Sequence, residues 1–96
     1  MTTMRTTKME NQIMLAMTTN EYTDGSEASW GQWTWAVIDE SGIHPKQARG
    51  VLSSLIQKGL VTEERFARPP DEYSLHFTDT GKVAVKAILE LRRERR

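Results

Sequence analysis

A chain of 96 residues without cysteine has the size of one domain with one hydrophobic core, and no disulfide contributes to its stability. Apolar residues make up 38% of the sequence and charged residues 27%, which excludes a disordered chain, and no apolar run reaches the length of a membrane-spanning helix. Thirteen basic and thirteen acidic residues cancel, so no overall positive field attracts nucleic acid. Because the N-terminus also lacks the order of a secretory signal, we expect a cytoplasmic protein that does not associate with membranes.

The N-terminal part of the sequence predicts a short arm followed by a helix. Residues 1–6 are polar and threonine-rich, which predicts a disordered arm ahead of a domain at residues 7–91. Thr7 and Glu10 have the spacing of a capping box, so a helix is expected to begin at Thr7. The apolar residues on its face are Met9, Ile13, Met14, Leu15, Ala16 and Met17. This wide stripe predicts core packing or partial cover by another chain.

A loop, three tryptophans and a second helix come next. Turn-forming residues at 23–27 predict a surface loop. Three tryptophans fall within residues 30–35, and most of them are expected in the core or in an interface, because each carries a large apolar area. A short strand is predicted at residues 32–34, where Thr34 is placed to cap a helix over residues 35–41.

The third predicted helix has the clearest periodicity in the sequence. Gly42 suits the left-handed end of the preceding helix, and Pro45 suits the first turn of the next one. The inner face of this helix follows from its apolar positions: Ala48, Val51, Leu52, Leu55 and Ile56. The residues that are expected to face outward are Lys46, Gln47, Arg49, Gly50, Ser53, Ser54 and Gln57.

A hairpin and a last helix complete the chain. Gly59 ends the third helix, and residues 60–64 and 73–77 are predicted to form two strands joined by a turn-rich segment with Arg65 and Arg68. A final helix is expected from about residue 79. Its apolar face is predicted to be Val83, Ala84, Ala87, Ile88 and Leu91, with Val85 and Leu89 on another flank, open to a second subunit. Residues 92–96 are predicted to form a basic tail.

This order of elements over residues 7–91 resembles the winged helix-turn-helix family. The segments that carry the resemblance are Ser41–Arg49, Leu52, Leu55, Lys58–Val61 and Leu75–Gly81. In MarR-like and phage-type regulators a similar KGLV segment ends the recognition helix and opens the wing, and a similar T-x-x-G segment begins the following helix. The resemblance implies an α+β, mostly helical fold with a three-helix core, a short strand, a two-stranded wing and a C-terminal helix.

The resemblance also implies a function, namely sequence-specific binding of double-stranded DNA by a transcriptional regulator. The third helix would enter the major groove, and the residues expected at this contact are His44, Lys46, Gln47, Arg49, Gly50, Ser53, Ser54 and Gln57. Arginine and lysine pair with guanine, and glutamine can bind adenine bidentately. Arg65 and Arg68 would reach phosphates or the minor groove. A homodimer through the first and last helices would read two half-sites.

Two residues of the third helix keep alternative readings. Gly50 either marks a close approach by a partner surface, or is merely tolerated, or packs against a neighbouring helix. Lys58 either contacts a phosphate or bonds the last carbonyls of its own helix.

Enzymatic activity, a metal and a cofactor are not expected. His44 and His76 stand apart, without a partner at metal-ligand spacing. The acidic pairs Asp39-Glu40 and Glu63-Glu64 are typical of solvated faces. Zero net charge and the dense tryptophans leave open a second interpretation, a protein-protein interaction module on the same scaffold. A third interpretation is an effector-sensing regulator with a tryptophan-lined pocket.

Overall fold

The computed structural model describes residues 6–20, 22–24, 26–66 and 72–94. Over these ranges the chain forms four α-helices, a short 3-10 helix and one three-stranded antiparallel sheet, which makes an α+β, mostly helical fold. The elements are α1 (Lys8–Thr19), η1 (Glu27–Ser29), β1 (Gln32–Trp33), α2 (Thr34–Ser41), α3 (Pro45–Gln57), β2 (Val61–Phe66), β3 (Glu72–Phe77) and α4 (Asp79–Glu94). Most of the expected arm, Arg68 and the last two residues of the expected tail lie outside the described residues.

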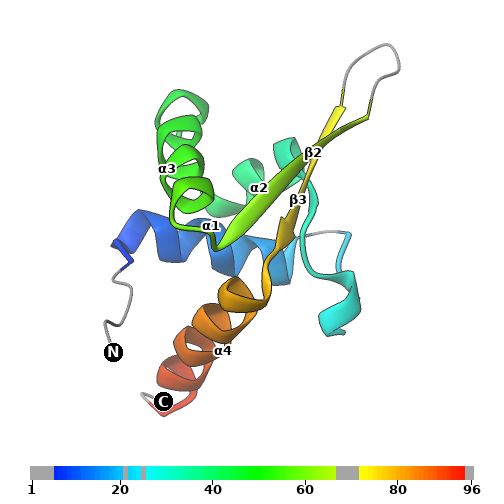
Figure 1. Cartoon of the computed structure of the whole chain (residues 1–96). Helices are drawn as coiled ribbons and strands as arrows, with labels where there is room; N and C mark the ends of the chain where they lie inside the picture. The colour runs from blue at the N-terminus through cyan, green and yellow to red at the C-terminus, as the bar shows by residue number, and fades with distance from the viewer. Residues whose placement is uncertain (1–5, 21, 25, 67–71, 95–96) are drawn as a thin grey trace.

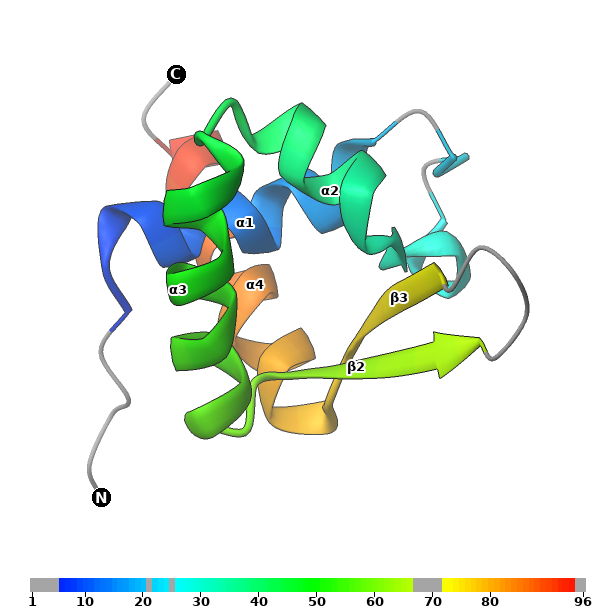
Figure 2. The same ribbon diagram turned by 90° about the horizontal axis from the view of Figure 1, so that it is seen from above.

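The arrangement of the elements gives the molecule two distinct ends. Figure 1 shows α3 and the ends of β2 and β3 that lie farthest from α4 at one end of the molecule, and α4 projecting from the other. Seen from above, α3 and the hairpin lie on the two sides of α4, and α1 passes behind α3 (Figure 2). Among the described residues no helix has the length and apolar character that crossing a membrane requires.

The first helix α1 is the centre of the core. The predicted capping box is confirmed, because Glu10 N–H donates to Thr7 Oγ1 at 3.1 Å and Thr7 N–H donates to Glu10 Oε1 at 2.8 Å. Ile13, Met14 and Met17 are fully buried, and α1 packs against α2, α3 and α4. The wide apolar stripe is therefore explained by contacts on several sides within one chain.

The sheet has the order β1-β3-β2, with Val61 paired to Phe77 and Glu64 to Ser74 across the hairpin. The hairpin strands run one or two residues further toward the turn than the alternation predicted. Gly31 has φ +109°, and a Cβ at this position would overlap the carbonyl oxygen of Leu75. A glycine is therefore needed where β1 approaches β3.

Two sequence segments that are far apart form one joint between α3, β2 and α4. Gly59 adopts φ +74° and ends α3, and Thr78 Oγ1 donates to its carbonyl at 2.6 Å. Thr78 N–H donates to the Leu60 carbonyl at 3.1 Å, and Thr78 Oγ1 accepts from Gly81 N–H at 3.0 Å. A Cβ on Gly81 would overlap the Leu60 carbonyl oxygen. This joint sets the position and rotation of α4 relative to α3.

Because of this joint, the predicted inner face of α4 is only partly right: Ala84 and Ile88 pack against the core, but Val83, Ala87 and Leu91 do not. Val85 is fully buried, whereas Val83 is 70% exposed and Leu91 is 55% exposed. Ala87 is also exposed. Two apolar stripes follow helical spacing in this segment, and the close contact of Gly81 with Leu60 decides which of them faces the core. The helix also continues to Glu94, into the segment that was expected to be a tail.

Two smaller expectations also need correction, and the one for the tryptophans is met in part. The helix α2 begins at Thr34, one residue earlier than predicted, and Thr34 does not cap it because its hydroxyl donates to Glu63 Oε2 at 2.7 Å. Ile56, expected on the inner face of α3, is exposed because it lies at the edge of the stripe near the helix end. Of the tryptophans, Trp30 packs against the core and Trp33 is half-buried, whereas Trp35 is 52% exposed.

Candidate nucleic-acid interface

The helix α3 presents a polar face to the solvent, as the periodicity predicted. Its start is fixed by Pro45 in the first turn and by His44, whose Nδ1 accepts from Lys46 N–H at 3.2 Å. Ala48, Leu52 and Leu55 are buried beneath it. The exposed residues of the predicted contact are His44, Lys46, Gln47, Arg49, Gly50, Ser53 and Gln57. Seven of the eight residues expected on or next to this helix are therefore accessible together.

Gly50 lies in the middle of this face with open space in front of it. A Cβ built on Gly50 meets no atom of the described residues within 4 Å. The alternative that Gly50 packs against a neighbouring helix of this chain is therefore wrong for these residues. What remains is a tolerated glycine or a place where a partner surface approaches the backbone closely.

Arg49 is held by an acidic residue of the hairpin. Its Nη1 lies 3.3 Å from Glu63 Oε2, and the same oxygen accepts from Thr34 Oγ1 at 2.7 Å. The Glu63 side chain is only 14% exposed, so the expectation of a solvated Glu63-Glu64 pair is wrong for Glu63. The physical reason is the strand geometry, since Glu63 pairs with Leu75 in register and both turn toward the helices. Through Thr34, Arg49 and Glu63, these polar contacts join α2, α3 and β2.

Ser54 does not belong to the accessible face. Its hydroxyl donates to Glu10 Oε2 at 2.6 Å, and Lys58 Nζ donates to Glu10 Oε1 at 2.6 Å. Glu10 itself is 2% exposed. The expectation that Ser54 belongs to the outward face is wrong, because a carboxylate from the first turn of α1 reaches the C-terminal half of α3 and binds its hydroxyl. The sequence marks Glu10 as a capping residue and contains no signal for this second contact.

The charge of Glu10 is stabilised in this buried position. Burial raises the pKa of Glu10. Hydrogen bonds from Lys58, Ser54 and the Thr7 backbone, together with the Lys58 charge, lower it by more than burial raises it, so the pKa of Glu10 lies below its ordinary value. The carboxylate is therefore ionised at neutral pH and compensates Lys58. This ion pair with Glu10 is a contact that the sequence did not predict for Lys58.

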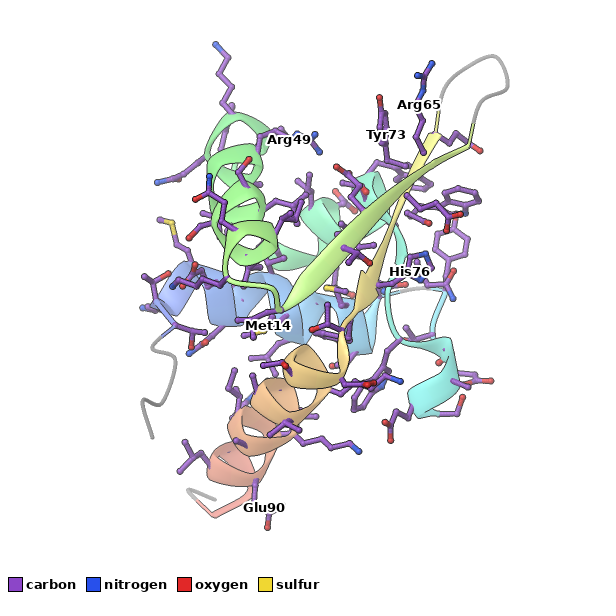
Figure 3. The ribbon with its side chains drawn as sticks, in the orientation of Figure 1. Met14, Arg49, Arg65, Tyr73, His76 and Glu90 are labelled. Atoms are coloured by element: carbon purple, nitrogen blue, oxygen red, sulfur yellow. The ribbon has the colours of Figure 1, made fainter. Side chains whose placement is uncertain are left out.

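The hairpin brings further polar and aromatic groups to the same end of the molecule. Arg65 on β2 pairs in register with Tyr73 on β3, and both side chains are exposed. Figure 3 shows Arg49, Arg65 and Tyr73 at the end of the molecule opposite Glu90. A hollow of about 240 Å³ lies between α2, α3 and the hairpin; its lining residues are Thr34, Trp35, Ile38, Arg49, Glu72 and Tyr73. Arg68 lies outside the described residues.

An aromatic surface adjoins this end of the molecule. The exposed rings of Trp35 and Tyr22 meet edge to face, with centroids 5.9 Å apart and an angle of 85° between their planes. A second hollow, of about 740 Å³, continues from Trp35 over the turn between α2 and α3; its other lining residues are Ile38, Asp39, Gly42, Ile43, His44 and Pro45. The sequence left open whether each tryptophan lies in the core or in an interface, because a tryptophan in the first turn of a helix gives no sign of which way it points.

The remaining candidate groups of the sequence have local roles. Trp30 and Trp33 line a hollow of about 240 Å³ with Ser74 and His76, which is below the roughly 300–1,000 Å³ of small-molecule pockets. His76 Nε2 lies 2.9 Å from Ser74 Oγ and 3.6 Å from Glu64 Oε2. Within the described residues no three His, Cys, Asp or Glu side chains are grouped as a metal site would require.

Comparison with known proteins adds no relative to this description. The sequence matches no family model, and neither the curated proteins nor the solved structures include a match.

Proposed function

We propose that this chain is a winged helix-turn-helix protein that binds double-stranded DNA sequence-specifically as a transcriptional regulator, with α3 in the major groove. The observation that carries the proposal is the accessible polar face of α3, which lies at the same end of the molecule as the ends of β2 and β3 that are farthest from α4. An α-helix fits the major groove, where each base pair presents a distinct pattern of donors and acceptors. A protein with this role acts where the genome is, in keeping with the cytoplasmic expectation.

The side chains on α3 suit the reading of base edges. Lys46, Gln47 and Arg49 lie in its first half, where a recognition helix contacts bases. Gln47 can donate to and accept from adenine, and a well-placed bidentate contact contributes about 1–3 kcal/mol of discrimination. Gly50 has no side chain and Ser53 has a small one, so the backbone at the centre of this face can come close to the base edges in the groove.

Arg49 is suited to base reading rather than to a phosphate. Its Nη1 is engaged by Glu63, and an arginine has five N–H donors, so further donors of its planar fork remain for a guanine edge. The carboxylate of Glu63 disfavours a nearby phosphate, but it does not prevent a neutral base from approaching. In this proposal Glu63 and Thr34 hold the reading group in place before DNA binds.

The β2–β3 hairpin is the wing of this proposal. Arg65 contacts the phosphate backbone or the adjacent minor groove, and Tyr73 across the strand pair supplies a hydroxyl for the same backbone. Arg68 stays a candidate for the turn that joins the two strands. Such contacts position the protein, whereas α3 selects the sequence. The proposal includes no catalytic step, metal or cofactor.

The test is direct DNA binding by the full chain. Fluorescence anisotropy with a labelled random-sequence duplex at low salt is expected to show binding, and selection from a random duplex pool is expected to enrich one motif. The variant K46A/Q47A should lose the enrichment. The matched variant K8A/Q12A removes the same two residue types from exposed positions of α1 and should behave as wild type. If the wild-type chain ignores duplex DNA at low salt, the proposal is wrong.

The exposure of Trp35 beside the larger hollow favours a second candidate function, docking of a protein partner. A half-exposed tryptophan on the rim of an apolar hollow is a typical anchor for a bound side chain. Peptides selected on the wild-type chain, with Trp35→Ser for counter-selection, are expected to depend on Trp35 if this candidate holds. A selection that enriches no such peptide contradicts it.

A further inference from the structure

The outer face of α4 carries an apolar stripe that no described part of the chain covers. Val83 is the most exposed large apolar side chain among the described residues, and Leu91, on the same helix, is the second most exposed. Ala87 lies between them and is also exposed. A spacing of four residues puts the three side chains on one face, one turn apart. The core contact of α4 is made on the other side by Val85.

This stripe continues into a hollow between α1 and α4. The hollow has a volume of about 320 Å³, and Leu91 is part of both the stripe and the hollow, which is also lined by Leu15 and Ile88. The apolar surface is therefore wider than one helix. It lies on α4, which projects from the end of the molecule opposite α3 (Figure 1).

We propose that this surface, the Val83–Ala87–Leu91 stripe, binds the α4 helix of a second copy in antiparallel orientation. A two-fold axis at Ala87 puts Val83 at the height of Leu91 of the second copy, and the small side chain of Ala87 allows the two helices to approach closely. This inference does not depend on DNA binding.

The charges beside the stripe favour this occupant and this orientation. Lys86 and Glu90 lie on the same flank of the stripe, at about −100° and −60° from Ala87 on a helix that turns 100° per residue. In an antiparallel pair the same flanks of the two copies meet, so each Lys86 lies beside Glu90 of the other copy. In a parallel pair both charges would face Ala84 and Ile88 instead. A chain with zero net charge also adds no overall repulsion between copies.

The present partner of Lys86 does not prevent this pairing. Lys86 Nζ lies 3.1 Å from Glu27 Oε2, and both side chains are about half exposed. Exposed pairs of this kind contribute only about 0–1 kcal/mol, so an exchange of partners costs little. A single helix pair buries less than the roughly 800 Å² per partner of a standard interface, and we therefore expect a dissociation constant on the order of micromolar.

Sedimentation equilibrium of the full chain from low to high micromolar concentration tests the proposal. The wild type is expected to shift from monomer to dimer, and Val83→Glu should weaken self-association by about tenfold or more, corresponding to about 1.4 kcal/mol. The control Glu40→Lys changes the charge of an exposed residue on α2 and should leave the dimer intact. Thermal unfolding of each variant shows whether it is folded.

A charge-swap experiment tests the orientation. Lys86→Glu and Glu90→Lys should each self-associate more weakly than the wild type, because the Lys86–Glu90 contacts across the two-fold axis become pairs of like charges. An equimolar mixture of the two variants should form a heterodimer, in which both contacts are again between opposite charges. A wild type that stays monomeric over the whole range, or a mixture that does not associate, would overturn the proposal.

Discussion

Lys58 Nζ lies 2.6 Å from Glu10 Oε1 and so joins the last residues of α3 to the first turn of α1. The same carboxylate accepts hydrogen bonds from the Ser54 hydroxyl and from the Thr7 backbone N–H. One buried side chain therefore caps α1 and also binds α3 on the side opposite its solvent-exposed polar face. In the described residues no buried side-chain nitrogen or oxygen lacks a hydrogen-bond partner. This satisfied network explains how a charge can lie in the core of a small domain.

Removing the cation from this network is expected to destabilise the fold. Lys58→Met leaves the buried Glu10 carboxylate without its counter-charge, and breaking a buried pair in this way costs about 3–5 kcal/mol. Urea unfolding followed by circular dichroism measures the change. Lys46→Met, at an exposed position on the same helix, should change the free energy of unfolding by less than about 0.5 kcal/mol. Equal effects of the two substitutions would contradict this account.

The network also predicts how stability depends on pH. The pKa of Glu10 in the folded chain lies below the ordinary value of 4.5, so acid protonates this group in the unfolded state first. Its contribution is fully present above pH 4.5 and is lost as the pH falls through the lower folded pKa. The difference in unfolding free energy between wild type and Glu10→Gln should therefore shrink on acidification. Hydrogen bonds with Ser26 and Ser29 lower the pKa of Asp24 to about 2. Because Asp24 is present in both proteins, its contribution cancels from the difference in unfolding free energy.

Two glycine-to-alanine substitutions are expected to have opposite effects on stability. In Gly81→Ala the new Cβ overlaps the Leu60 carbonyl, and such overpacking against backbone should cost about 3 kcal/mol or more. In Gly50→Ala the Cβ projects into open space, and the better helix propensity should add up to about 1 kcal/mol. Thermal unfolding distinguishes the two. If the DNA proposal holds, Gly50→Ala should also bind its selected site more weakly, despite its higher stability.

Neutralising Glu63 is expected to lower sequence discrimination without lowering general affinity. Glu63→Gln weakens the hold on Arg49 and removes a negative charge near the DNA, so the affinity for scrambled duplex should stay equal or rise. The preference for the selected site should fall by about 1 kcal/mol, within the range of one specific contact. Anisotropy titrations on the two duplexes measure both values. Glu64→Gln, the exposed neighbour, is the control and should preserve the preference.

Removing the arginine of the hairpin is expected to weaken binding to all duplexes alike. Arg65→Ala deletes one phosphate contact, so the slope of log K against log salt should decrease by about 0.9. The ratio of affinities for selected and scrambled duplex should stay constant. Arg92→Ala removes the same charge from α4, at the other end of the molecule, and should leave the slope unchanged. A change in the ratio would mean that Arg65 reads bases.

Local patterns predicted most of the elements. The capping box at Thr7, the glycines at 42 and 59 and the periodicity of α3 act within one or two turns of the chain, and each is confirmed in place, except that Ile56 at the end of the α3 stripe is exposed. The outward positions of Lys46, Gln47 and Arg49 followed from the buried positions, because a helix has a fixed period. These residues were therefore found without knowledge of any contact.

Contacts between distant segments were not predictable in this way. The sequence alone determined that α4 is an amphipathic helix, but only the tertiary structure decided that Val85 faces the core and Val83 the solvent, because the helix has two apolar stripes and its rotation depends on the contact of Gly81 with Leu60. In the same way, the sequence predicted that Glu10 caps α1, that Ser54 contacts the DNA groove and that Glu63 is solvated. Their partners lie 14 to 48 residues away along the chain. Whether residues so far apart in the sequence meet depends on how the helices pack, and such pairing leaves no periodic pattern in the sequence.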